Sequence, residues 1–193
     1  KAEAAWFEHA DRYTAELNYS FNYKQKGKKF EARMFAGITN GKAAGYFASL
    51  GLNAVNASTD YKFAETFIGG LSSKFWDYQF VPGNGNFYTP TPYNENLNKL
   101  LALTVKTSLP AVPLKLYANM AWVPKSEFYT ANLQFETGLE LQVIPKFLSV
   151  YFPVAFSKDI ADFHAAKKFG YLKKVGFMLN FDAANPFYLI RNL

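Results

Sequence analysis

The histidine and carboxylate side chains of the stretch SKDIADFHAAKK are the first candidates for chemistry in this sequence. His164 follows Asp159 and Asp162, and Lys158 opens the same stretch. An imidazole near two carboxylates could ligate a metal ion or pass a proton. The alternative interpretation is a solvated loop or a short surface helix that carries an ordinary histidine. The second interpretation is the simpler one, and the first stays a hypothesis.

Other reactive groups are scarce in the 193 residues. The chain has no cysteine, which excludes a thiolate metal site and a disulfide framework. Its second histidine, His9, has Glu8 and Asp11 beside it but would need ligands from elsewhere to hold a metal. The Gly-rich stretch PGNGN lacks the Lys and the Ser or Thr of a phosphate-binding loop. We therefore expect no cofactor, no metal site and no catalytic residue in this segment.

The composition limits the classes of partner. The net charge is +6, and the basic residues are spread over turns rather than gathered in a stripe that could follow a phosphate backbone. We therefore expect no nucleic-acid partner. Half of the residues are hydrophobic, yet no run approaches the roughly 20 apolar residues of a transmembrane helix. If this chain crosses a membrane, strands must do it.

Alternation of apolar and polar residues is the dominant pattern in the chain. In DRYTAELNYSFNYK, every second residue from Tyr13 to Tyr23 is apolar or aromatic, and the residues between them are polar. A period of two predicts a β-strand with one apolar and one polar face. The pattern recurs in about nine segments, several of which approach the roughly 9–11 residues that a tilted strand needs to cross a bilayer. The predicted strands cover residues 13–23, 29–37, 46–54, 60–69, 101–107, 114–122, 129–143, 148–156 and 174–182.

These strands predict an all-β fold that fits two environments. An antiparallel transmembrane β-barrel of the outer-membrane type places the apolar face in lipid, whereas a soluble lipocalin-like barrel turns it to the core. Aromatic residues at strand ends, alternating short and long connections, and charges of both signs on the polar faces favour the membrane barrel. The odd number of strands suggests the C-terminal part of a larger barrel. We assign residues 1–182 to the barrel and 183–193 to a periplasmic or interface tail.

The membrane interpretation defines three sets of candidate site residues. The lipid-facing set is Tyr13, Leu17, Tyr19, Phe21, Leu50, Leu133, Phe135, Leu139, Phe152, Phe177 and Phe181. The polar set inside the barrel is Glu16, Glu31, Arg33, Glu136 and Glu140. This set forms either a cross-strand network that fills the lumen, which we prefer for a small barrel, or a selectivity ring in a pore. The third set, in a long loop, binds a partner or packs on itself, and comprises Phe75, Trp76, Tyr78, Phe80, Phe87 and Tyr88.

Several segments of residues 43–193 carry a family resemblance. The stretch LSVYFPVAFSKDIADF, followed by KKVGFMLNFDAANPFYLIRNL, is similar to the C-terminal outer-membrane β-barrel region of aminopeptidase-N-like (gluzincin) metallopeptidase family proteins from Gram-negative bacteria. The stretches DYKFAETFIGG, FWDYQFVPGNGNFYTP and LLALTVKTSLPAVPLKLYANM resemble earlier parts of the same region, in the same order.

The resemblance implies a membrane anchor in the outer membrane of a Gram-negative bacterium. The catalytic motif of that family, H-E-x-x-H with a downstream Glu, has no match in these residues, so no catalytic or zinc-binding residue is carried over. The implied partners are outer-membrane lipid, lipopolysaccharide and other proteins of an outer-membrane complex. Three functions stay open: an anchor that positions a peptidase-like domain or partner proteins, the membrane base of an active zinc aminopeptidase encoded upstream, and a soluble lipocalin-like ligand-binding barrel.

Overall fold

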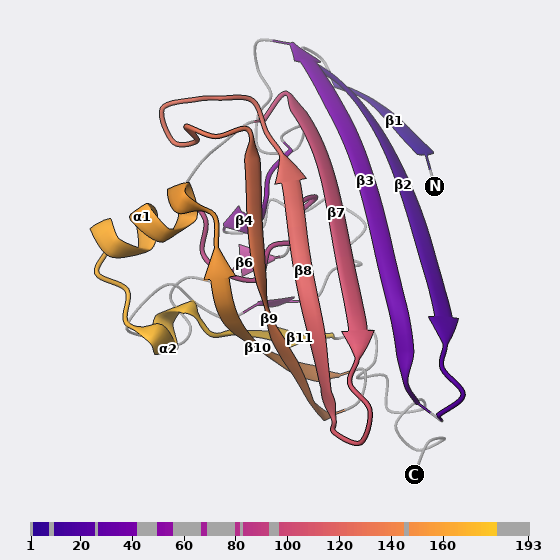
Figure 1. The fold of residues 1–193 in the computed structure, drawn as a ribbon. Coiled ribbons are helices and arrows are strands. Elements are labelled where there is room, and N and C mark those ends of the chain that lie inside the picture. Colours follow the sequence, from indigo (N-terminus) through magenta and orange to yellow (C-terminus); the bar gives the residue numbers. More distant parts are fainter. Residues whose placement is uncertain are drawn as a thin grey trace.

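One antiparallel sheet forms most of the structure (Figure 1). The computed structural model describes residues 2–7, 10–25, 27–41, 50–55, 67–68, 80–81, 83–92, 97–144 and 147–180. Its strands are β1 Ala2–Phe7, β2 Ala10–Asn22, β3 Lys29–Gly41, β4 Ala54–Val55, β5 Phe67–Ile68, β6 Phe80–Val81, β7 Lys99–Ser108, β8 Leu114–Trp122, β9 Leu133–Ile144, β10 Leu148–Phe156 and β11 Gly176–Leu179. In the order of hydrogen-bonded neighbours they run β1-β2-β3-β7-β8-β9-β10-β11-β5-β6-β4.

The long strands follow the predicted alternation. β8 and β10 have the bounds that the pattern predicts. β2 begins three residues earlier than predicted and ends one residue earlier, and β3 continues four residues further, so that the two pair along their whole length. β9 begins at Leu133 rather than at Tyr129. The reason is a local turn, in which the hydroxyl oxygen of Ser126 accepts hydrogen bonds from the backbone N–H groups of Phe128 and Tyr129, each at 3.2 Å.

The sheet differs from the prediction in the number of its strands. An all-β antiparallel fold is confirmed, but the described residues form eleven strands where the sequence predicts about nine. The sequence missed β1 and β6, and in the predicted strands 46–54 and 60–69 the described part of the chain holds only the two-residue strands β4 and β5. Among the described residues, β1 and β4 form the two edges of a curved sheet that does not close into a barrel (Figure 1).

Two short helices connect β10 to β11, namely α1 Lys158–Ala166 and α2 Tyr171–Lys174. They project beside β10, on the flank of the sheet that is far from β1 (Figure 1). Of the two interpretations of SKDIADFHAAKK, the structure has the short helix, although His164 within it is buried rather than solvated. No helix in the described parts of the chain is long and apolar enough to cross a membrane.

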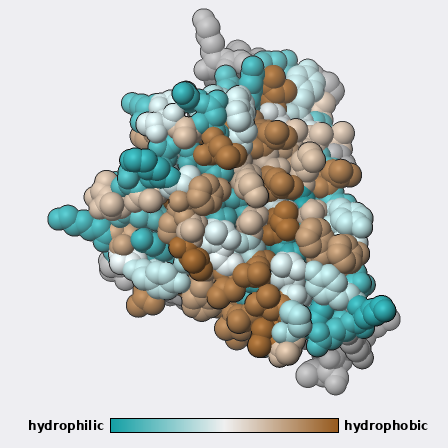
Figure 2. All heavy atoms as spheres, in the orientation of Figure 1, coloured by the Kyte–Doolittle hydropathy of each residue, from teal (hydrophilic) through white to brown (hydrophobic). Residues whose placement is uncertain are grey.

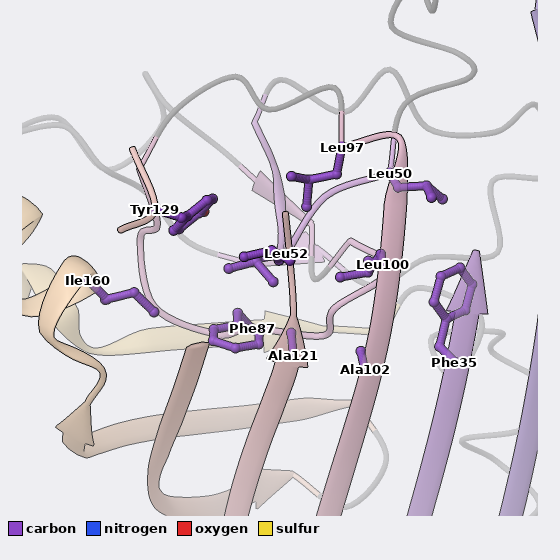
Figure 3. Packing of buried hydrophobic residues seen from close by; sticks show 11 residues of the cluster. Phe35, Leu50, Leu52, Phe87, Leu97, Leu100, Ala102, Ala121, Tyr129 and Ile160 are labelled. Atoms are coloured by element: carbon purple, nitrogen blue, oxygen red, sulfur yellow. The ribbon is translucent and has the colours of Figure 1, made fainter. Parts of the chain in front are cut away.

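The apolar core lies on the inner side of the sheet, toward one end of the strands (Figure 3). Leu52 and Phe87 lie on segments that cross over the sheet and pack against Ala102 of β7 and Ala121 of β8. Ile160 of α1 joins the same cluster, so the helix takes part in the core. The other buried members are Phe35, Leu50, Leu97, Leu100, Val123 and Tyr129.

Leu50 corrects the predicted lipid-facing set, because it is fully buried in this core. Among the described residues 50–55, Leu50 forms an isolated bridge to Leu97 on the inner side of the sheet. Its side chain lies over Gly37 of β3, where an added Cβ would come within 2.9 Å of the Leu50 methyl carbons. The alternation around Leu50 therefore ends in a segment that packs inside the molecule.

Replacing Gly138 of β9 with alanine should destabilise the sheet by about 1–3 kcal/mol. A Cβ at this position would clash with the carbonyl oxygen of Phe152 and lie 2.9 Å from Pro153 Cα and from the Tyr117 hydroxyl oxygen. The pairing of β9 with β10 is already irregular at Pro153, so the backbone would have to move further. Gly170→Ala is the matched control, because nothing lies within 4 Å of its added Cβ. Urea unfolding followed by circular dichroism compares the two variants, and equal stability would contradict the packing at Gly138.

Candidate functional site: an apolar outer face over a filled polar interior

The outer face of the sheet is apolar across five neighbouring strands. The strand register places five large side chains side by side in one row from β2 to β9, namely Leu17, Met34, Leu103, Met120 and Phe135. Their exposed fractions run from 65% at Leu17 to 37% at Leu103 and Phe135. A continuous row of exposed large apolar side chains is typical of a surface that contacts lipid or another apolar partner.

Aromatic side chains lie toward both ends of this face. On one side of the row from Leu17 to Phe135, Trp122 pairs with Leu133. On the other side of that row, Phe21 stacks on Phe30, with ring centroids 5.2 Å apart. From Tyr13 to Phe21, β2 covers about 26 Å at roughly 3.3 Å per residue, or about 20 Å of height at the usual tilt of a membrane strand. Figure 2 shows hydrophobic residues gathered over the middle strands of this face, with hydrophilic residues toward its margins.

The predicted lipid-facing residues have different positions in the structure. The outer face exposes Tyr13, Leu17, Tyr19, Phe21, Leu133 and Phe135. Partly exposed positions are Leu139, Phe152 and Phe177. Leu50 is in the core, and Phe181 lies outside the described residues. Contact of these side chains with lipid stays a prediction.

The predicted polar set lies on the inner face and is joined by ion pairs between strands. Arg33 of β3 pairs with Glu16 of β2 at 2.9 Å and donates to the carbonyl oxygen of Asn84 at 2.8 Å. Glu31 of β3 pairs with Lys115 of β8 at 2.9 Å. The sequence left open a cross-strand polar network or a selectivity ring, and these contacts have the form of the network.

Glu140 belongs to a second cluster, which contains a partly buried lysine beside a stacked pair of tyrosine rings. Lys106 of β7 pairs with the Glu140 carboxylate at 2.9 Å and donates to the Tyr151 hydroxyl at 3.1 Å. Its ammonium lies 4.7 Å from the ring centroid of Tyr88 and 4.9 Å from that of Tyr151. Tyr117 meets both rings edge-on. Tyr88 and Tyr151 stack on each other with centroids 3.9 Å apart, so the ammonium lies beside the stacked pair and is stabilised by the Glu140 carboxylate and the Tyr151 hydroxyl.

Glu136 of β9 binds residues 83–91 to the sheet. Its carboxylate is fully buried and accepts hydrogen bonds from the backbone N–H groups of Tyr88 at 2.6 Å and Thr89 at 3.1 Å. The side-chain amide of Asn119 donates a third bond at 2.8 Å. Because backbone groups donate two of these bonds, the contact fixes the path of the segment, which fills the inner side of the sheet.

The position of residues 83–91 corrects the predicted partner loop. Phe87 and Tyr88 are 0% and 1% exposed and belong to the two core clusters, so neither forms an exposed contact surface. Of the two predicted roles, partner binding or packing within the molecule, these two residues have the second. Phe80 lies in β6, and three residues of the set lie outside the described residues, namely Phe75, Trp76 and Tyr78.

Asp159 fastens α1 to the end of the sheet. Its carboxylate accepts hydrogen bonds from the Thr130 hydroxyl at 2.6 Å, the backbone N–H of Ala131 at 3.1 Å and the Gln134 amide at 2.7 Å. Burial by itself would raise the pKa of the Asp159 carboxyl, but these hydrogen bonds outweigh it and hold the pKa below its usual range. The carboxylate therefore serves as a structural acceptor rather than a proton donor.

His164 links α1 to residues 83–91. Its Nε2 donates to the carbonyl oxygen of Pro90 at 2.7 Å, and its ring meets Phe156 edge-on with centroids 4.9 Å apart. Its Nδ1 is buried and has no hydrogen-bond partner among the described residues. Burial lowers the pKa of the imidazole, the Pro90 carbonyl acts in the opposite direction, and the charge of Lys174 lowers the pKa further. The structure therefore holds His164 neutral.

The described residues contain no arrangement suited to metal binding. No group of three His, Asp or Glu side chains among them is placed to hold a metal ion. Asp159 and His164, which are close in the sequence, bind different segments and do not form a joint site. What this arrangement can do is hold α1 and residues 83–91 firmly against the sheet while it presents an apolar outer face.

Sequence reasoning missed some residues of the interior. Tyr117, Tyr151 and Asn119 complete the network around Lys106 and Glu136 but stand outside the predicted polar set. Alternation places Tyr117 and Asn119 on the same side of β8 as Lys115, and that was the available signal. Which of these groups meet across the sheet depends on contacts between distant parts of the chain.

Comparison with known proteins adds no relative. No family model matches the sequence, and no curated protein and no solved structure matches the chain. A relation to the aminopeptidase-N-like proteins therefore stays a proposal, and the function is argued from the two faces of the sheet.

Lowering the pH below about 6.5 should loosen α1 and residues 83–91. The pKa of His164 is lower in the folded state than in the unfolded state. The neutral ring therefore contributes its full stability at a pH above the unfolded-state pKa, and this stability is lost as the pH falls through the folded-state pKa. Protonation would add a buried donor without an acceptor at Nδ1. Hydrogen exchange of both segments above and below about pH 6.5 measures the effect. His164→Gln keeps a donor but does not titrate, so an undiminished pH response in this variant would show that another group is responsible.

Proposed function

We propose that this chain is an outer-membrane β-barrel segment of a Gram-negative bacterium that anchors or positions a peptidase-like domain or partner proteins. The observation that carries the proposal is the polarity of the sheet. Leu17 and Leu133 are 65% and 57% exposed on one face, whereas Glu136 and Glu140 are 0% and 2% exposed on the other. A protein that folds in water keeps charged residues outside, whereas a membrane barrel has an apolar outer band and a polar interior.

The interior also favours an anchor over a pore. Ion pairs, the tyrosines around Lys106 and residues 83–91 occupy the inner side of the described sheet. A small barrel whose interior is filled by side chains is a packed body without an aqueous channel. A soluble lipocalin-like barrel is less well supported, since its interior would have to be apolar to hold a ligand.

The sequence resemblance supports the peptidase-like partner domain. In the related possibility, an active zinc aminopeptidase encoded upstream uses the same segment as its membrane base. The upstream reading frame distinguishes the two, because an active enzyme of that class requires an H-E-x-x-H motif there. The membrane role of the present residues is the same in both cases.

Leu17→Arg should reduce folding into lipid vesicles by an amount equivalent to about 2–4 kcal/mol. Leu17 lies midway between Tyr13 and Phe21 on the apolar face of β2, so the new guanidinium would enter the middle of the lipid-facing band. Folding into phosphatidylcholine vesicles, followed by heat-modifiable mobility on gels, measures the loss.

Ser20→Arg is the matched control, because it introduces the same side chain on the opposite face of the same strand. Ser20 is exposed and lies directly opposite Glu31 of β3, so an arginine there has a carboxylate neighbour. We expect this variant to fold as the parent does. In a water-soluble protein both substitutions would fall within about 0.5 kcal/mol of the parent. Equal tolerance of the two would therefore exclude the membrane assignment.

A further inference from the structure

The edge of the sheet is open along part of β2. β1 pairs with β2 from Ala10 to Ala15, and no strand in the described ranges pairs with residues 17–22 on the same side. On its other side, β2 pairs with β3 as far as Asn22. The backbone N–H and C=O groups that residues 17–22 direct to the open side are therefore available to a further strand.

This part of the edge lacks the features that keep sheet edges from pairing. Natural edge strands are short, carry charges or proline, or are interrupted by a bulge. At the opposite edge of the described sheet, β4 has only two residues. The sequence of residues 17–22, LNYSFN, has no charge and no proline, and its pairing with β3 runs without a shift of register. The open part of β2 is thus suited to pairing with another strand.

The membrane function proposed above makes a partner for this edge necessary. Leu17, Tyr19 and Phe21 are exposed on the apolar outer face, so this part of β2 lies in the band that would contact lipid. Open sheet edges do not occur within the hydrocarbon region, because their backbone groups would have no hydrogen-bond partners there.

The same stretch in a second copy of the chain has the side chains that this edge requires. Directly opposite residues of antiparallel strands lie on the same face of the sheet. If Tyr19 lies opposite Tyr19 of a second copy, Leu17 lies opposite Phe21 on the apolar face. On the polar face, Asn18 then lies opposite Ser20. β1 is also antiparallel to β2, so the β2 strand of the second copy would follow the line of β1 along the part of the edge that β1 leaves open.

We propose that two copies of this chain pair through residues 17–21 of β2, antiparallel and related by a twofold axis at Tyr19. This proposal rests on the membrane function proposed above and names a second copy as the partner of one sheet edge. The pairing joins the two sheets edge to edge, so that the apolar outer face of one continues into that of the other.

Single cysteines test the pairing, because the chain has no cysteine of its own. Directly opposite residues of antiparallel strands have Cα atoms about 4.5–5.5 Å apart, which a disulfide can span. The full chain is folded in phosphatidylcholine vesicles at a low ratio of protein to lipid and oxidised with dithiodipyridine. Tyr19→Cys should then run as a disulfide-linked dimer on non-reducing gels. Tyr13→Cys is the matched control, because it lies on the same face of β2 where β1 covers the edge, and it should stay monomeric.

A mixture of two further variants tests the register. Leu17→Cys alone and Phe21→Cys alone should stay monomeric, because each cysteine lies four positions, or about 13 Å, from its counterpart along the paired strands. The mixture should form dimers that contain one molecule of each variant. Heat-modifiable mobility on gels shows that each variant has folded, and the mixture tests the pairing even if Tyr19→Cys does not fold.

The outcomes separate this proposal from the membrane function. If the parent and the variants fold in the vesicles but neither Tyr19→Cys nor the mixture forms dimers, the edge pairing is wrong while the membrane function stands. Equal yields of dimer from Tyr19→Cys and Tyr13→Cys would indicate random collision and would also overturn the pairing. If the parent does not fold into vesicles, both proposals fail.

Discussion

The hydrogen bonds of the Glu136 carboxylate are the interaction on which the interior depends. Removing a carboxylate from water is costly unless its oxygen atoms receive other hydrogen bonds, and the backbone N–H groups of Tyr88 and Thr89 supply two of them. The sheet therefore needs residues 83–91 as much as those residues need the sheet. With the segment in place, Tyr88 stacks on Tyr151, and the ammonium of Lys106 lies beside this pair of rings. The contact of Glu136 thus also fixes the surroundings of the partly buried Lys106.

The polarity of the two faces follows from the same constraint. Successive side chains of a strand point to opposite faces, so a sheet that turns Glu136 inward must turn Phe135 outward. Each charged residue on the inner face has an apolar residue beside it in the sequence that lies on the outer face. The register of five strands aligns such apolar residues in the row from Leu17 to Phe135. The apolar outer face and the ionic interior are therefore one feature of the sequence. Each charged group of the inner face still needs partners that replace water, as Lys106 provides for Glu140 and three hydrogen-bond donors provide for Glu136.

Local pattern explains which parts of this structure could be predicted. The bounds of β8 and β10 follow from the alternation of apolar and polar residues along each strand. This pattern is local and needs no knowledge of the rest of the chain. The burial of Leu50 and Phe87 could not be predicted in that way, because it depends on Leu97, Gly37 and the sheet beneath them. Tyr88 and Glu136 are likewise 48 residues apart in the sequence. Alternation gives the side of a strand on which a residue lies, but not which distant segment covers it.

The anchoring function proposed above requires a segment beside the sheet that is rigidly joined to it. Helix α1 is joined to the rest of the structure through two different side chains. Asp159 binds it to Thr130 and Gln134 at the start of β9, and His164 binds it to Pro90 in the segment that Glu136 holds. The helix is therefore attached both to the sheet and to the filling of the sheet. A displacement of α1 would have to break hydrogen bonds in both places, so the helix is held firmly at this end of the sheet.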